Sequence, residues 1–107
     1  MTVYANVHLW MADAQTQAEQ NAWAKQLNEM KALNPDVVIP GHMKASTQLD
    51  AANIDFSIQY LKDFAHAKQS SDSSKLLINK MTNSYPEAVL PMALSIGAKV
   101  HKGEMKW

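Results

Sequence analysis

The run Val37-Val38-Ile39-Pro40-Gly41-His42 (VVIPGH) is the most informative stretch of this 107-residue sequence. It opens with three consecutive β-branched residues, a composition typical of a strand that is covered on both faces. Pro40 and Gly41 then indicate a turn. A helix is predicted to end just before the run, at Asn34-Pro35, because the residue before a proline avoids the α region. Helix, strand and glycine turn in this order form the second half of a β-α-β unit.

The helix upstream of the run has a clear beginning. Thr16 and Glu19 have the spacing of a capping box, in which the threonine hydroxyl accepts the Glu19 amide and the glutamate reaches back. Four apolar residues then recur at spacings of four, three and three, which place them on one helix face: Trp23, Leu27, Met30 and Leu33. The sequence therefore predicts a helix from Thr16 to the Asn34-Pro35 break.

Most of the remaining chain is also predicted to be helical. Residues 2–10 are rich in β-branched and aromatic side chains and are predicted to be extended, with one short strand. A second helix is predicted from Asp50 as its N-cap, a third from about Ser73 to the Tyr85-Pro86 break, and a fourth from about Glu87 to Val100. Gly97 interrupts the fourth helix at some cost to helicity. The expected fold is a single domain, residues 1–107, mostly α with one or two short strands, in the order helix-strand-helix-helix-helix.

The composition narrows the function classes. An apolar fraction of 47% and a charged fraction of 19% are those of a globular protein. The net charge is zero and all ten basic residues are lysines, which argues against a nucleic-acid-binding protein. There is no cysteine, so a disulfide, a cysteine-ligated zinc or a thiol nucleophile is excluded. The sequence contains no apolar stretch long enough for a membrane span.

The predicted strand at Val37–Ile39 raises a question of pairing. A buried strand cannot satisfy its own backbone hydrogen bonds, so this run needs partner strands that the rest of the sequence does not clearly encode. Two arrangements remain open. Either the chain pairs with a second copy of itself in a dimer, or the partner strands belong to a missing N-terminal part of a longer fold.

Four histidines are the candidates for metal chemistry: His8, His42, His66 and His101. None has the sequence spacing of a metal-binding pair. His42 follows the predicted strand and turn, and is expected at the carboxyl edge of a sheet, where catalytic groups gather in α/β folds. The alternative is a surface histidine without a role. His66 and His101 lie late in predicted helices, where a partial positive charge suits the helix dipole.

Taken with its flanks, the VVIPGH run resembles the last metal-ligand segment of the metallo-β-lactamase superfamily. In that family a helix leads through L-x-P-x, here Leu33-Asn34-Pro35-Asp36, into a strand and a Pro-Gly-His-Gly turn. Residues 6–10 and 12–13 resemble the stretch after the bridging aspartate of the family, and residues 97–107 resemble the tail of a bacterial subgroup. The resemblance covers nearly the whole chain. It implies the C-terminal part of an αββα fold that hydrolyses an ester, lactone, thioester or amide with zinc.

The sequence also departs from the family pattern. The H-x-H-x-D-H motif, the second histidine segment and the bridging aspartate motif are absent, and Met43 stands where glycine is commoner. Of the ligand set, only His42 is carried over as a zinc ligand. His8 is expected either to face a substrate near the active-site side or to be packed within a strand. Lys44 is expected to be solvated, or else to contact an anionic group of a substrate.

One imidazole cannot hold zinc tightly, because hydrolytic zinc sites take three protein ligands and a water. The isolated chain is therefore expected to be inactive and to bind no zinc tightly. The alternative function is a small helical module, without catalysis, that self-associates or binds a partner. Its seven methionines would then serve an adaptable interface.

Overall fold

A computed structural model of the chain describes residues 3–44, 47 and 50–106, and for His42 it describes the backbone alone. Its helices are α1 (Gln17–Ala32), α2 (Ala52–Gln69), α3 (Ser74–Ser84) and α4 (Pro91–His101), with a short 3₁₀ helix η1 (Met11–Asp13). Its strands are β1 (Tyr4–Ala5) and β2 (His42–Met43). The predicted mostly helical fold with one or two short strands is confirmed.

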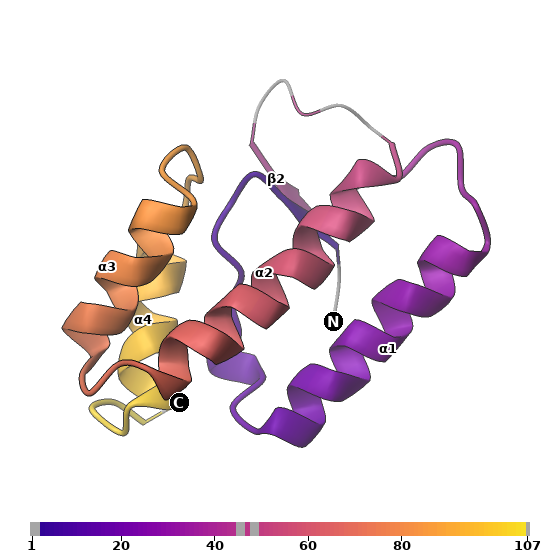
Figure 1. Cartoon of the computed structure of the whole chain (residues 1–107). Coiled ribbons are helices and arrows are strands. Elements are labelled where there is room, and N and C mark those ends of the chain that lie inside the picture. The colour runs from indigo at the N-terminus through magenta and orange to yellow at the C-terminus, as the bar shows by residue number, and fades with distance from the viewer. Residues whose placement is uncertain (1–2, 45–46, 48–49, 107) are drawn as a thin grey trace.

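Helix α2 is the central element of the molecule. It lies between α1 on one side and the pair formed by α3 and α4 on the other (Figure 1). Tyr60 and Phe64 of α2 are fully buried, as are Leu27 of α1 and Leu77 of α3, so these helices share one apolar core. None of the helices in the described part of the chain combines the length and apolar character needed to cross a membrane.

The two strands form a small parallel sheet, and the chain that connects them contains α1. Tyr4 is paired with His42 and Ala5 with Met43. Backbone hydrogen bonds extend the pairing at both ends, from Gly41 N to Val3 O (2.9 Å) and from Lys44 N to Ala5 O (3.2 Å). The chain therefore has a β-α-β connection, but its second strand is His42–Met43 instead of the predicted Val37–Ile39. The partner of β2 is β1 of the same chain, which is neither of the two arrangements left open by the sequence.

The N-terminal segment also pairs on its other side. Val7 forms a parallel bridge with Val89, and the amide of His8 donates to the carbonyl of Val89 (2.8 Å). Residues 4–8 therefore lie between the β2 segment and the chain that leads into α4. This arrangement brings three distant parts of the sequence side by side.

The prediction of a buried strand at Val37–Ile39 is wrong. Val37 is 63% exposed and Ile39 is 70% exposed, while Val38 alone is buried. Its carbonyl accepts a hydrogen bond from the Asn53 amide on α2 (3.1 Å) rather than from a strand. Pro40 has no amide hydrogen, so backbone pairing with β1 begins only at Gly41. The strand lies after the turn instead of before it.

The predicted helix beginnings are confirmed in two cases and shifted in two. Thr16 and Ser73 are the N-caps of α1 and α3, and each hydroxyl accepts the amide three residues later. Helix α2 begins two residues after Asp50, whose carboxylate accepts the amide of Ala52 (3.0 Å). Helix α4 begins at Pro91 rather than near Glu87, because the preceding residues pair with the N-terminal segment through Val89.

Candidate functional site

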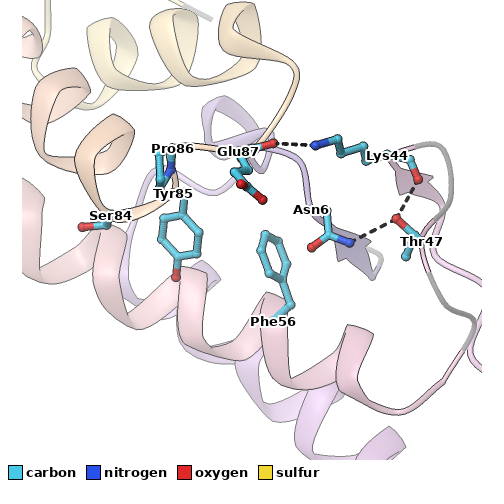
Figure 2. A pocket seen from close by; sticks show the side chains of 9 residues that line it. Asn6, Lys44, Thr47, Phe56, Ser84, Tyr85, Pro86 and Glu87 are labelled. Carbon is cyan, nitrogen blue, oxygen red and sulfur yellow. Dashed lines mark hydrogen bonds between the residues drawn. The ribbon is translucent and has the colours of Figure 1, made fainter.

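A pocket of about 470 Å³ opens beside the carboxyl ends of the two strands. Asn6 follows β1 directly and Lys44 follows β2 directly, so both side chains are placed by the sheet. The rest of the lining comes from Thr47, from Phe56 of α2, from Ser84 at the end of α3 and from residues 85–88 between α3 and α4 (Figure 2). Ligands of parallel α/β proteins bind outside the carboxyl ends of the strands, which makes this pocket the candidate site.

A chain of hydrogen bonds fixes the orientation of Asn6 at the pocket wall. The Thr47 hydroxyl donates to the carbonyl of Lys44 (2.6 Å), and Asn6 Nδ2 lies 3.1 Å from Thr47 Oγ1. A threonine hydroxyl has one proton. Because that proton is given to Lys44 O, Thr47 accepts from the Asn6 amide nitrogen. The Asn6 Oδ1 atom therefore faces the pocket interior, as Figure 2 shows.

Asn6 reaches this position with a left-handed backbone. Its φ angle is 58°, a region that asparagine tolerates better than most residues. Its carbonyl accepts the amide of Val89 (3.2 Å), which anchors the turn after β1. The unusual backbone therefore lies where the chain leaves β1 and enters the pocket wall.

Lys44 and Glu87 meet at the rim of the pocket. The Lys44 ammonium donates to the backbone carbonyl of Glu87 (3.2 Å). The Glu87 carboxylate is a separate group that points inward, toward the space between Tyr85 and Asn6 (Figure 2). The cation on the rim is thus held by a neutral carbonyl, and the carboxylate faces the cavity.

Phe56 and Tyr85 form an aromatic wall. Their ring centroids are 5.6 Å apart at an interplanar angle of 77°. The Tyr85 hydroxyl donates to Asp63 Oδ2 (2.6 Å), outside the pocket. Burial, with the neighbouring Asp63 carboxylate, raises the pKa of Tyr85 far above its usual range, so the phenol stays protonated. The pocket is therefore lined by the aromatic rings, and the Tyr85 hydroxyl is directed elsewhere.

A second hollow of about 630 Å³ continues from the first along α2. The two share Asn6, Thr47, Phe56 and Tyr85, and the second adds Asp50 and Asp55. Asp55 is paired with Lys31 of α1 (2.7 Å). The two hollows therefore adjoin each other, and each has a carboxylate in its lining.

The predicted zinc ligand, His42, opens β2 two residues before Lys44, so its expected position at the carboxyl edge of the sheet is wrong. Its backbone is paired with Tyr4, but its side chain lies outside the described part of the structure. Among the residues that are described, no three histidine, aspartate or glutamate side chains come together as a metal site. The role of His42 as a zinc ligand stays a prediction.

His8 lies in the core. It is 3% exposed, and its Nδ1 atom is 2.9 Å from the Tyr60 hydroxyl. The two rings meet edge to face with centroids 5.9 Å apart. Burial lowers the pKa of His8, which favours the neutral imidazole. These are the contacts of a packed side chain, and they direct the ring toward α2.

The last two histidines differ from one another. His66 is exposed near the end of α2. His101 closes α4, where Nε2 donates to the carbonyl of Met11 (2.7 Å) and the ring packs edge-on against Phe64. Burial lowers the pKa of His101. His101 therefore lies at a helix end as predicted, with a structural role, and its burial favours the neutral imidazole.

Sequence reasoning points to only one residue of the pocket wall, Lys44. The other lining residues come from separate segments of the chain. Among them, Asn6 has a local sequence signal for a site, because it is an asparagine that directly follows a strand. In the sequence, Tyr85 and Pro86 predict only the end of a helix. Comparison with known proteins gives no match for this chain among family models, curated proteins or solved structures.

Proposed function

We propose that this chain is the C-terminal part of a zinc-dependent hydrolase of the metallo-β-lactamase type, in which His42 is a zinc ligand. One observation supports the proposal above the others. The VVIPGH run enters the second strand of a parallel β-α-β unit, and the carboxyl edge of that unit carries the pocket. His42 is the first residue of that strand, two residues before Lys44, which follows the strand and lines the pocket.

The remaining zinc ligands must come from outside this sequence. A zinc-bound hydroxide would supply the nucleophile for an ester, lactone, thioester or amide when the full set of ligands is assembled. With His42 alone, the ligand number is too small for tight binding. The chain by itself is therefore expected to be inactive.

Zinc titration calorimetry tests the role of His42. The wild-type chain is expected to bind zinc weakly, and His42→Ala should remove most of that binding. His66→Ala, which removes an exposed histidine from α2, is the matched control and should bind as the wild type does. Zinc binding that is unchanged in His42→Ala would contradict the assignment. Tight binding of one zinc by the wild type would contradict the expected inactivity.

The proposed origin has its own test. In-frame coding sequence upstream of Met1, in this gene or in an intact relative, should encode an H-x-H-x-D-H segment. If neither contains it, the chain does not derive from a hydrolase of this type.

A second candidate function is self-association, and the surface around β2 favours it. Met43 of β2 is 44% exposed, and in the chain that leads from α1 to β2 Leu33, Val37 and Ile39 are 81%, 63% and 70% exposed. In the described part of the chain β2 pairs with β1 alone, so its other edge is available for pairing with a second copy. A net charge of zero provides little repulsion between copies.

Light scattering after size exclusion tests self-association. The wild type is expected to form dimers, and Ile39→Lys should shift the population to monomers by placing a charge beside the β2 edge. Leu76→Lys, at an exposed leucine of α3, is the matched control and should leave the dimer intact. A wild-type chain that stays monomeric at high concentration would exclude this function.

A further inference from the structure

We propose that the pocket beside the strand ends binds a small organic cation, an ammonium group carried on a short apolar or aromatic body. The inference rests on the chemistry of the pocket wall and is independent of zinc binding by His42. It requires three things of the pocket: acceptors that face inward, an apolar surface for the body of the ligand, and a net preference for positive charge.

The inward-facing polar groups are acceptors. Thr47 gives its proton to Lys44 O, which forces Asn6 to direct Nδ2 at Thr47 and Oδ1 into the cavity. The Glu87 carboxylate points into the same space (Figure 2). An ammonium group has donors and no acceptor, so it matches this pair of oxygen groups.

The apolar surface is aromatic. Phe56 and Tyr85 stand at 77° to each other, so a ligand between Asn6 and α2 meets ring surface. Aromatic faces attract cations within about 6 Å of the ring centre. Because the Tyr85 hydroxyl is committed to Asp63, the ring presents no competing donor to the ligand. A volume of about 470 Å³ lies in the range of small-molecule sites.

The charge of Lys44 distinguishes a site for a cation from a site for an anion. Its ammonium is bound to the Glu87 carbonyl at the rim, and the inward groups are of the opposite kind. In a cation site Lys44 is a like charge that opposes binding, whereas in an anion site it would be the main attraction. Asp50 lines the adjoining hollow and adds a negative charge there. The substitution Lys44→Met should therefore strengthen the binding of a cation.

Two-dimensional ¹H–¹⁵N NMR titrations with benzylammonium test the proposal, with benzoate and benzyl alcohol as probes of similar size. Benzylammonium is expected to shift the amides of Asn6 and Ala88 in a saturable way and to bind more tightly than the other two probes. Lys44→Met should tighten its Kd, and Glu87→Gln should weaken it, each by about two- to fivefold for a partly exposed charge. Phe56→Leu should also weaken the binding of benzylammonium, because the aromatic face is lost.

Glu29→Gln, which removes an exposed carboxylate from α1, is the matched control for Glu87→Gln and should leave the Kd unchanged. The spectra themselves report whether each variant is folded. The proposal is overturned if benzoate binds as well as benzylammonium, or if Lys44→Met weakens the binding of the cation. It is also overturned if benzylammonium produces no shift around the pocket at millimolar concentrations.

Discussion

At the residue scale, the Ser57 hydroxyl joins α2 to β1. It accepts the amide of Tyr4 (2.9 Å) and donates to the carbonyl of the same residue (2.6 Å). Ser57 is fully buried. A helix side chain thus takes the place of a neighbouring strand, because it satisfies both the donor and the acceptor of one strand residue.

Ser57→Ala is expected to destabilise the chain by about 1–3 kcal/mol, the usual cost when buried polar groups lose their partner. Ser84→Ala, at an exposed serine that ends α3, is the control and should change stability by less than about 0.5 kcal/mol. Urea unfolding followed by circular dichroism measures both values. A loss as small as that of the control would show that the Tyr4 backbone does not depend on this hydroxyl.

Gly97 is needed for a close approach between α4 and η1. A Cβ atom at this position would lie 3.3 Å from Met11 Cβ and 3.5 Å from Met11 N. Gly97→Leu is therefore expected to cost about 1–3 kcal/mol in unfolding free energy, because the longer side chain forces the two elements apart. Met92→Leu, on the exposed side of α4, is the control and should have little effect. Similar unfolding midpoints for the two variants would contradict the close contact.

At the scale of elements, the start of α1 depends on its cap. The Thr16 hydroxyl accepts the amide of Glu19 (3.1 Å) and also donates to the Glu19 carboxylate (3.0 Å). Thr16→Ala should lower the unfolding free energy by about 1 kcal/mol. Thr82→Ala, at an exposed position inside α3, is the matched control. It removes the same atoms without a cap and should be neutral within about 0.5 kcal/mol. Equal effects of the two substitutions would mean that the cap contributes nothing.

Elements with local signals are the ones that the sequence predicts well. The caps at Thr16 and Ser73 and the break at Asn34-Pro35 act within a few residues, so the bounds of α1 and the start of α3 follow from them. The short strands are different. Val37–Ile39 has the composition of a buried strand. Pairing, however, depends on which backbone groups form hydrogen bonds with β1, and because of Pro40 these hydrogen bonds begin only at Gly41.

The candidate site escapes prediction for the same reason. Asn6, Thr47, Phe56 and Glu87 carry no shared spacing, and they become neighbours only through β1–β2 pairing and the packing of α2. The direction of the Asn6 amide is a property of its hydrogen-bond partners. A single sequence therefore suggests Lys44 as a possible ligand contact, and the acceptor character of the pocket follows only from the assembled chain.

At the scale of the whole molecule, two buried histidines link stability to pH. Burial lowers the pKa of His8, and burial, with the Lys68 charge, lowers the pKa of His101. His101 Nδ1 is buried and has no hydrogen-bond partner in the described part of the chain, so a proton added there would lack an acceptor. Both rings are therefore neutral in the folded state at pH values where the unfolded chain already binds protons.

The sign of the pH dependence follows from these lowered pKa values. An unfolded histidine titrates near about pH 6.5, so the contribution of the two rings to stability is complete above that pH. It is lost progressively as the pH falls from about 6.5 through the folded-state pKa values. The Glu104 carboxylate, bound to Ser74 at the start of α3, also has a lowered pKa, but a glutamate ordinarily titrates near 4.5, so its contribution to stability is lost at lower pH. The decline between about pH 7 and pH 5 is therefore expected to come mainly from the histidines.

Urea unfolding at a series of pH values tests this expectation. The wild-type free energy of unfolding should fall between about pH 7 and pH 5, and His101→Phe should fall less steeply because one titrating ring is gone. His8→Phe should reduce the slope in the same way, and the double variant should be the least dependent on pH. The comparison uses slopes, so the stability that each variant loses with its hydrogen bond, to Met11 O or to the Tyr60 hydroxyl, does not obscure the result. A wild-type slope retained in the double variant would show that neither ring is the source of the acid sensitivity.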